Sequence, residues 1–419
     1  MALPARPLPA ALRTRAAIED DEARALAPYA ERASASRGRA HPSEPHPYRT
    51  AFQQDRDRII HTTAFRRLQY KTQVFITYEG DYYRTRLTHT YEAAQIARTI
   101  ARALGANMDL VEAVTLAHDL GHSTFGHSGE ATLDRIMLER AGLDPADPAN
   151  RGRGFNHTVQ SLRVVERLEH RWRAFPGLNL TWETREGIAK HRTDYDEVHG
   201  DWLAPYGPHE RASLEGQIVN YADELTYSAH DLDDGLRSGM IRDDMPELTR
   251  LEVWQRASAG IREDDPELRR HQIIRRAIDL LVSDLVYASA ESIAAAQPST
   301  PDDVRASPRA LVTLSSAMVQ PESELKAFLF EHLYRHHRVV RMFRKAERVL
   351  LELFGTFEDD YRQLPPRTQE LLRAAQPDLQ PGRRLTMQAH RVIADYLAGM
   401  TDRYALQEHR RLFDPLEPA

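Results

Sequence analysis

Apolar residues recur at the period of an α-helix along most of this chain, and this pattern constrains the fold more than any other feature. Between residues 85 and 104 the apolar side chains fall on one helical face, and Gly105 follows as a typical C-terminal stop. Strand patterns are weak, and the best of them spans residues 74–78. The sequence therefore predicts an all-α fold. Further helical patterns cover residues 109–120, 157–168, 213–236, 271–295, 322–354, 366–374 and 386–414.

Length and loop composition predict how these helices are organised. A chain of 419 residues can bury a large core, and no internal repeat points to a helical solenoid. Proline, glycine, serine and aspartate mark loops at residues 145–154 and 298–308. We expect a weakly ordered N-terminal extension over residues 1–45, one large helical core over 46–345, and a C-terminal helical part over 346–419 packed on that core.

Composition excludes several classes of protein. No run of about 18 apolar residues is present, which argues against a membrane span. The first residues are rich in alanine, arginine and proline but include several acids, so a signal peptide is not expected. The chain has no cysteine, and its net charge of −6 does not require nucleic acid as a partner. We expect a cytoplasmic protein whose metal ligands, if any, are histidines and carboxylates.

The most informative local feature is the adjacent pair His118-Asp119. The pair follows an apolar helix that we expect to start with a capping box at Asp109 and Glu112 and to stop at Gly121. An imidazole beside a carboxylate is a mixed nitrogen and oxygen ligand set for a divalent metal. Three candidate acids or bases follow within eleven residues of Asp119, namely His122, His127 and Glu130. The alternative is a histidine-rich surface loop, since the chain has 19 histidines.

Two other helices offer the further ligands that a metal needs. His89 lies near the start of the 85–104 helix, and Asp223, Tyr227 and Asp231 recur every four residues along the 213–236 helix. Alone, such a polar stripe indicates a solvent-exposed face. A lone His89 likewise indicates a structural histidine. The ordered combination of these residues favours a metal site.

The order of His89, His118-Asp119 and Asp223 resembles the four metal ligands of the HD-domain phosphohydrolases. More narrowly, the chain is similar to the deoxynucleoside triphosphate triphosphohydrolases, the bacterial dGTPase-like proteins. The matching stretches span roughly residues 49–340. They are Asp57-Arg-Ile-Ile-His61, Phe65-Arg-Arg-Leu68, Lys71-Thr-Gln-Val74, Arg86-Leu-Thr-His89, His118-Asp-Leu-Gly-His122, Phe125-Gly-His127, Asn156-His157, Phe175-Pro-Gly-Leu-Asn-Leu180, Gly187-Ile-Ala-Lys-His191, Leu325-Lys326 and Leu333-Tyr334.

The resemblance implies a single HD-domain helical fold and a metal-dependent reaction. His89, His118, Asp119 and Asp223 would bind one divalent ion, either Mn, Mg, Fe, Co or Ni. Water would attack the α-phosphorus of a deoxynucleoside triphosphate and release the deoxynucleoside and inorganic triphosphate. The resemblance makes His127 the general acid, with Glu130 orienting its ring. His122 would contact the α-phosphate, and His157 matches a further catalytic histidine.

The same resemblance implies the contacts to substrate. Arg86 would reach the α-phosphate, and Lys326 the terminal phosphates. Lysine is scarce here, with only four in 56 basic residues, which fits a phosphate contact for Lys326. Tyr334 would pack on the base or sugar. Gln73 and Asp231 would bind the sugar 3′-hydroxyl, and Tyr227 would exclude a 2′-hydroxyl. Family members commonly form homo-oligomers, often hexamers, and some are activated by a regulatory dNTP.

Three alternatives stay open at this point. The first is another HD-class enzyme, such as a phosphodiesterase, a 5′-nucleotidase or a guanosine tetraphosphate hydrolase. Such an enzyme shares the ligand quartet but lacks the other matching residues, namely Gln73, His122, His127, Glu130, Lys326 and Tyr334. The second is a non-catalytic nucleotide or DNA sensor, which would not need a general acid. The third is a helical interaction scaffold, which leaves the ordered motifs unexplained. No GxxxxGK[ST] loop is present, so phosphate is not bound as in P-loop proteins.

Overall fold

The computed structural model describes residues 9, 11–74, 83–192, 201–380 and 382–418. Their regular structure is helical, and the only strand-like pairing among them is three isolated bridges, so the predicted all-α fold is confirmed. The helices are α1 (Arg15–Ala25), α2 (Ala51–Ile60), α3 (Thr63–Arg67), α4 (Arg86–Leu104), α5 (Met108–His118), α6 (Gly126–Ala141), α7 (His157–Arg163), α8 (Trp182–Ala189), α9 (Leu214–Arg237), α10 (Pro246–Thr249), α11 (Glu252–Ser258), α12 (Pro266–Ala296), α13 (Pro301–Ala306), α14 (Ser316–Leu329), α15 (His337–Asp359), α16 (Pro366–Ala375), α17 (Met387–Ala398) and α18 (Asp402–Phe413).

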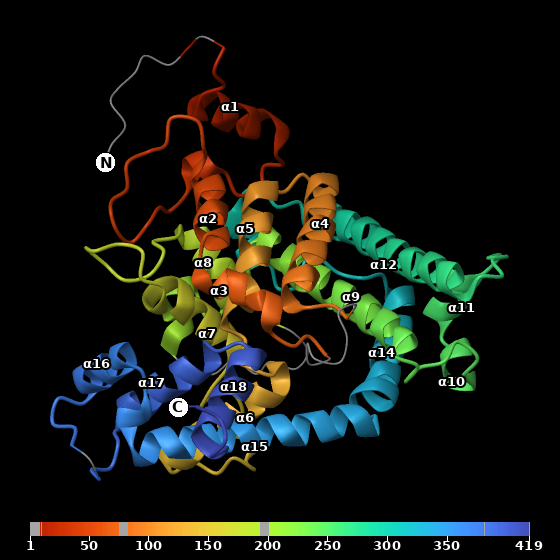
Figure 1. Cartoon of the computed structure of the whole chain (residues 1–419). Coiled ribbons are helices and arrows are strands. Elements are labelled where there is room, and N and C mark those ends of the chain that lie inside the picture. Colours follow the sequence, from red (N-terminus) through yellow and green to blue (C-terminus); the bar gives the residue numbers. More distant parts are fainter. Residues whose placement is uncertain (1–8, 10, 75–82, 193–200, 381, 419) are drawn as a thin grey trace.

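Helices α4, α5, α9 and α12 pack side by side and form the centre of the molecule (Figure 1). Their apolar faces share one large core that includes Ile100, Val111, Ile218 and Leu281. Burial of such apolar surface is the main stabilising contribution to a helical fold. Because α4, α5 and α9 meet here, side chains at their polar positions are brought together from three distant parts of the chain.

The ends of α4 follow the expected local chemistry, whereas those of α5 do not. Helix α4 ends at Gly105, whose φ of 69° is the left-handed conformation that glycine adopts readily. Helix α5 is capped by Asn107, which accepts hydrogen bonds from two backbone amides, so the predicted capping box of Asp109 and Glu112 is wrong. Helix α5 also ends before the predicted Gly121, because residues 119–121 form a 3-10 turn.

A second core joins the C-terminal helices to α6. Helices α15 and α17 pack on α6, and α18 packs on α15, on the side of the molecule away from α1 and α2 (Figure 1). The apolar residues of this core include Leu133, Leu353, Phe357 and Ile393. Helix α6 begins directly after the segment that carries His122. The C-terminal helices are therefore packed beside the candidate site.

Several predicted elements have different bounds in the structure. The single helix expected over 322–354 is two helices, α14 and α15, separated by a π-turn at Phe330–Tyr334. The helix expected over 386–414 is interrupted at residues 399–401, where Thr401 caps α18. Part of the predicted loop 298–308 is the short helix α13, capped by Thr300. Residues 75–78 of the predicted strand lie outside the described residues, and Val74 is not in a strand.

The weak order expected for residues 1–45 does not extend over that whole segment. Helix α1 begins after Thr14, whose side chain caps it. Farther along, Ala30 and Ala33 are buried, and Glu31 forms an ion pair with Arg305 of α13. Part of this segment is therefore packed on the core.

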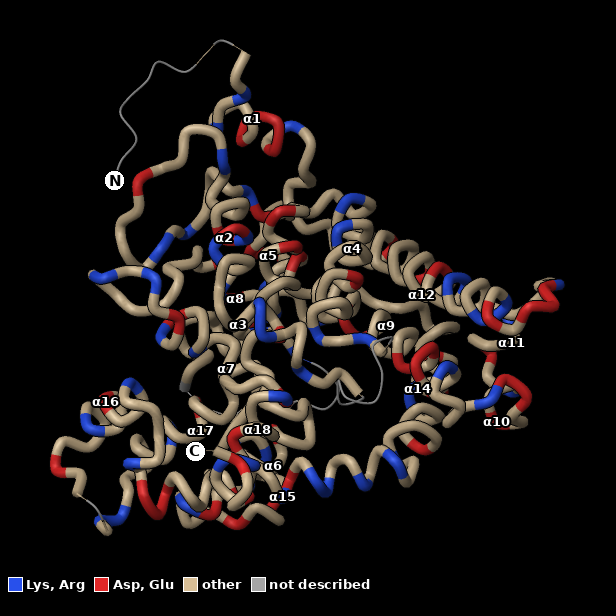
Figure 2. The backbone as a smooth tube through the Cα atoms, in the orientation of Figure 1, with Lys and Arg blue, Asp and Glu red and all other residues tan. Residues whose placement is uncertain are grey.

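Acidic and basic residues are both spread over most helices (Figure 2). The first half of α15 is an exception, because its charged residues are mainly basic. Basic side chains there include Arg338, Arg341, Arg344 and Lys345. Among the described residues, every helix is either too short or too polar to span a bilayer.

Candidate active site

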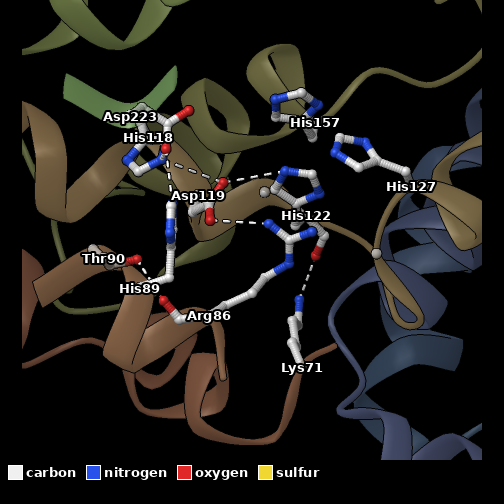
Figure 3. A network of polar contacts seen from close by, with 12 residues as sticks. Lys71, Arg86, His89, Thr90, His118, Asp119, His122, His127, His157 and Asp223 are labelled. Atoms are coloured by element: carbon white, nitrogen blue, oxygen red, sulfur yellow. Dashed lines mark hydrogen bonds and ion pairs between the residues drawn. The ribbon is translucent and has the colours of Figure 1, made fainter. Parts of the chain in front are cut away.

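Polar side chains from distant segments of the chain converge on one pocket, and Figure 3 shows the network of contacts at its centre. Helix α4 supplies Arg86 and His89, the end of α5 and the following turn supply His118 and Asp119, and α9 supplies Asp223. All five are at most 8% exposed. Buried charged groups are rare unless they pair or bind an ion, so this density indicates a functional site.

The four predicted metal ligands lie together, and we call His89, His118, Asp119 and Asp223 the metal-ligand cluster. His89 Nε2 is 2.8 Å from Asp223 Oδ1, and His118 Nε2 is 3.3 Å from the same oxygen. His118 Nε2 is also 3.5 Å from Asp119 Oδ1. By ligand-atom spacing they fall into two overlapping groups, one of His89, His118 and Asp119 and one of His118, His191 and Asp223. The two groups share His118.

The hydrogen bonding of His118 leaves a nitrogen for a metal. Its Nδ1 is 2.5 Å from the carbonyl oxygen of Thr115, which can only accept, so Nδ1 carries the proton. Its Nε2 is buried and makes no hydrogen bond of its own. A buried ring nitrogen that faces two carboxylates is stabilised when positive charge, either a bound metal ion or a proton in its place, lies between them. The donor set therefore fits a divalent metal ion.

Charges at this centre also fit a cation. Burial disfavours the charged form of His118, but the carboxylates of Asp119 and Asp223 outweigh it and raise its pKa to about 9. Burial also opposes ionisation of Asp119, yet His118, Arg86 and His122 hold the pKa of its carboxyl well below the ordinary value. Arg86 Nη1 donates to Asp119 Oδ2 at 2.9 Å. Burial likewise opposes ionisation of Asp223, but His118 outweighs it and holds the pKa of that carboxyl well below the ordinary value, so both carboxylates are ionised and attract positive charge.

A second histidine fixes the ring of His89. His230 Nε2 lies 2.5 Å from a carboxylate oxygen of Glu92, and His230 Nδ1 lies 3.3 Å from His89 Nδ1. Burial lowers the pKa of His230 to about 4, so the ring is neutral and its one proton sits on Nε2, facing the carboxylate. His230 Nδ1 then accepts from His89 Nδ1. His89 is left with Nε2 free to bind a metal, as outer partners of metal-bound histidines commonly arrange.

The predicted acid and base residues form a neighbouring cluster. Glu130 Oε2 is 3.3 Å from His127 Nδ1, and Glu130 Oε1 is 2.9 Å from His157 Nδ1 and 2.7 Å from the His157 backbone nitrogen. His122 stacks on His157 with ring centroids 4.0 Å apart, and its Nε2 is 3.1 Å from Asp119 Oδ1. His122 thus connects this cluster to the metal-ligand cluster.

Exposure separates the roles within this second cluster. His127 is largely exposed, whereas His122 and His157 are buried. Burial, reinforced by Arg86 and His157, lowers the pKa of His122 well below its ordinary value, so His122 is neutral. Burial raises the pKa of Glu130, but His157 and His127 outweigh it and hold that pKa well below the ordinary value. An ionised Glu130 can orient both rings.

The predicted substrate contacts line the same pocket. Gln73, Tyr227, Lys326 and Tyr334 lie along it with the metal-ligand cluster. Tyr334 donates to Asp231, and the rings of Tyr227 and Tyr334 are stacked 6.1 Å apart. Burial raises the pKa of Asp231 to about 8. Gln73, Tyr227, Lys326 and Tyr334 thus share one pocket with Arg86, as contacts to a single substrate require.

Lys326, the predicted contact to the terminal phosphates, already pairs with acidic side chains. Its ammonium forms ion pairs with Glu224 and Glu322. A phosphate that bound Lys326 would therefore enter beside two carboxylates. The sequence reasoning did not anticipate this pairing, because Glu224 lies on a different helix about a hundred residues away.

A wider cavity of about 670 Å³ continues from this pocket. Gln73, His127, Tyr227 and Tyr334 line both spaces. Aromatic side chains such as Phe155 surround the wider one. A ligand could thus place a polar group at the buried centre and a flat, less polar group in the wide cavity.

Comparison with known proteins connects this geometry to a family. Residues 86–228 match the HD domain, and residues 312–411 match the phosphohydrolase-associated domain. Deoxyguanosinetriphosphate triphosphohydrolase-like proteins from Ralstonia pickettii and Geobacter sulfurreducens are each 48% identical to the chain, over 393 and 394 residues. The alignments cover 93% and 94% of this chain and 94% and 96% of the relatives. The chain belongs to this HD-domain triphosphohydrolase-like family. It is therefore a hydrolase.

The two domains of the HD family meet at the site. The HD domain match contains His89, His118, Asp119 and Asp223, and the associated domain match contains Lys326 and Tyr334. HD domains bind divalent metals, which agrees with the ligand geometry. The role of each individual residue stays a prediction.

Three site residues have no role in the sequence-based interpretation. His191 lies 3.6 Å from Asp223 Oδ2 and faces His118 with ring centroids 4.8 Å apart. Glu92 and His230 are the other two, and they are the successive hydrogen-bonding partners that lead to His89. Helical spacing could have found the last two, since Glu92 is three residues after His89 and His230 is seven after Asp223.

Proposed function

We propose that the protein hydrolyses deoxynucleoside triphosphates to the deoxynucleoside and inorganic triphosphate. The observation that carries the proposal is the position of His127. It borders both the buried pocket with the metal ligands and the wide cavity beyond Tyr334. An acid at that boundary lies where a 5′-oxygen would join a phosphate to a nucleoside. The names of the curated relatives support the same reaction class.

The chain's own residues can perform the remaining steps. A bound divalent ion would supply charge to polarise the α-phosphate and to lower the pKa of water. Arg86 and the neutral His122 would orient the α-phosphate oxygens by donating hydrogen bonds. Water attacks the α-phosphorus, the bond to the 5′-oxygen breaks, and triphosphate keeps the added oxygen. His127 donates a proton to the leaving 5′-oxygen, with its ring held by the ionised Glu130.

Sugar selection would come from the other end of the pocket. Gln73 and Asp231 would hold the 3′-hydroxyl, Tyr227 would exclude a 2′-hydroxyl, and Tyr334 would pack on the base or sugar. A steric filter of this type favours deoxyribose. Lys326 would exchange one of its carboxylate partners for the terminal phosphates.

Product analysis tests the proposed reaction. Purified protein with Mn²⁺ is incubated with each of the four dNTPs, singly and mixed, and the products are separated. Deoxynucleoside with intact triphosphate is the expected result. Monophosphate with pyrophosphate, or orthophosphate alone, would place the protein in another phosphohydrolase class. Turnover only in mixtures would reveal a regulatory dNTP, and no turnover would support a sensor.

Other properties implied by the family resemblance stay predictions. They are the homo-oligomeric state, the regulatory dNTP, the cytoplasmic location, the metal identity and the domain limits at residues 45 and 345. Two histidine ligands favour Mn, Fe, Co or Ni over Mg by intrinsic affinity.

A further inference from the structure

The turn between α17 and α18 lies against the loop that carries His122. We call residues 397–402 the C-terminal turn and residues 122–126 the catalytic loop. Thr124 Oγ1, in the catalytic loop, lies 2.8 Å from the carbonyl oxygen of Leu397 and 3.0 Å from that of Met400, so its hydroxyl donates to the C-terminal turn. These contacts join segments more than 270 residues apart.

Asp402 connects the C-terminal turn to two segments of the site. Its Oδ1 accepts from the backbone nitrogen of Phe125 at 2.8 Å. Its Oδ2 accepts from the backbone nitrogen of Thr72 at 2.7 Å and from the Thr72 hydroxyl. The side chain is fully buried. One carboxylate therefore holds the catalytic loop and the segment that carries Gln73 at a fixed separation.

The backbone that Asp402 holds at Phe125 has an unfavourable conformation, which surrounding contacts must stabilise. Phe125 has φ 63° and ψ 24°, the left-handed region that bulky residues rarely adopt. Such conformations persist where surrounding contacts over-determine them, and they cluster at functional sites. Gly126 follows at φ 60°, where an added Cβ would lie 3.1 Å from Arg86 Nη2. His127 is the next residue, so its position depends on this backbone.

Lys71 makes a second bridge in the same place. Its buried ammonium donates to the carbonyl oxygen of His122 (Figure 3) and to that of Ala398 at 2.9 Å. The catalytic loop is thus attached to the C-terminal turn through Thr124, Phe125 and His122. Side-chain bonds of this kind keep catalytic groups in a productive geometry.

Helix capping does not account for Asp402. A carboxylate in the first turn of a helix often stabilises that helix alone. Here Thr401 caps α18 by accepting from the backbone nitrogen of Tyr404 at 3.2 Å. The hydrogen bonds of Asp402 go to other segments instead.

We infer that Asp402 is a positioning residue of the proposed reaction: it fixes the catalytic loop so that His122 stays against Asp119 and His127, the residue that follows the loop, stays at the edge of the same pocket. The inference rests on the proposed function. The associated domain then contributes to the chemical step through Asp402, besides the substrate contacts predicted for Lys326 and Tyr334. Asp402 lies far from the HD motifs in sequence, and its position in the sequence alone would not indicate a role in the reaction.

Asp402→Asn tests the inference with little change in volume. The amide keeps one acceptor oxygen, so it can hold Phe125 or Thr72 but not both as the carboxylate does. Glu358→Gln is the matched control. Glu358 accepts from Arg140 at 2.7 Å and lies 2.8 Å from His390 Nε2, so it also ties the C-terminal helices to α6, but at the far end from the catalytic loop.

Three measurements separate positioning from general stability. Hydrogen–deuterium exchange reports the protection of peptides covering residues 119–128, calorimetry reports Mn²⁺ affinity, and steady-state kinetics report kcat and KM for dNTP. For Asp402→Asn we expect faster exchange of these peptides, Mn²⁺ affinity within about 3-fold of wild type, and kcat lower by about 100-fold, the loss that a misplacement of about 1 Å can cause. For Glu358→Gln we expect exchange and kcat close to wild type.

Each other result overturns part of the inference. Unchanged exchange would show that Asp402 does not hold the loop. Faster exchange with unchanged kcat would show that the loop position does not matter for the reaction. Equal loss of kcat in Glu358→Gln would reduce the effect to stability. Failure of the wild type to release triphosphate overturns the proposed function instead, and exchange still tests whether Asp402 holds the loop.

Discussion

His89 and Asp223 are 134 residues apart in the chain, yet His89 Nε2 lies 2.8 Å from Asp223 Oδ1 at the centre of the molecule. The contact exists because α4 packs along α9 over a shared apolar face. Each residue lies on the edge of that face, where a polar group is buried by the packing of its neighbours. Together with His118 they form a site that no single helix could build.

Asp119→Ala should remove metal binding and activity together. The variant deletes a carboxylate whose ionised form is stabilised by His118 and Arg86. We expect Mn²⁺ affinity to fall by more than about 100-fold, beyond the loss typical of outer partners. Calorimetric titration with Mn²⁺ measures this directly, with Asp109→Asn at the opposite end of α5 as control. Full activity in the variant would show that the ligand assignment is wrong.

His127→Ala should abolish turnover while metal and nucleotide still bind. A general acid typically contributes about 10²–10⁴-fold to rate, so kcat should fall on that scale. Mn²⁺ affinity should stay near wild type, because the ring is turned toward Glu130 and not toward the metal-ligand cluster. The exposed His271 offers a matched control as His271→Ala. Loss of metal in His127→Ala would contradict the role assigned to it.

Glu92→Gln should weaken metal binding although Glu92 does not touch the metal ligands. An amide in place of the carboxylate no longer fixes the proton of His230 on Nε2, so His89 loses its defined tautomer. Outer partners of this kind change metal affinity by about 10–100-fold. Arg98→Gln, an exposed change on the same helix, should leave the affinity unchanged. Equal affinities for all three proteins would mean that His230 does not orient His89.

Asp231→Asn should change the pH dependence of stability in a predictable direction. Burial raises the pKa of Asp231 to about 8 in the folded chain, against about 3.9 for an unperturbed aspartate. Between these values the native state binds a proton that the unfolded state has lost, so this group lowers stability as pH rises from 4 to 8. The penalty is absent below pH 4 and complete above pH 8.

Thermal unfolding at pH 5 and pH 8.5 measures this effect. Asparagine cannot ionise, so the melting temperature of the variant relative to wild type should be higher at pH 8.5 than at pH 5, by at least about 2 °C. The comparison between two pH values cancels the effect of losing the Tyr334 hydrogen bond itself. An identical difference at both pH values would mean that Asp231 ionises normally in the folded chain.

Local pattern was sufficient for most helices but not for their ends. Periodicity placed α4 and α9 almost to the residue, because their apolar faces are long. It missed the interruption before α15, since apolar residues continue through the π-turn at Phe330–Tyr334. It also assigned the cap of α5 to Asp109, whereas that side chain accepts from Gln53 of α2. The choice between such partners depends on the neighbouring helix.

The sequence by itself determined the helical class, the family and the residue types of the site, because these depend on periodicity and on short ordered motifs. Tertiary structure alone decided which donors and acceptors meet. Only packing brings Glu92 and His230 to His89, pairs Lys326 with Glu224, and sets Asp402 beneath the catalytic loop. These contacts cross helices far apart in the chain, and their geometry follows from how buried faces fit together, which no local pattern encodes.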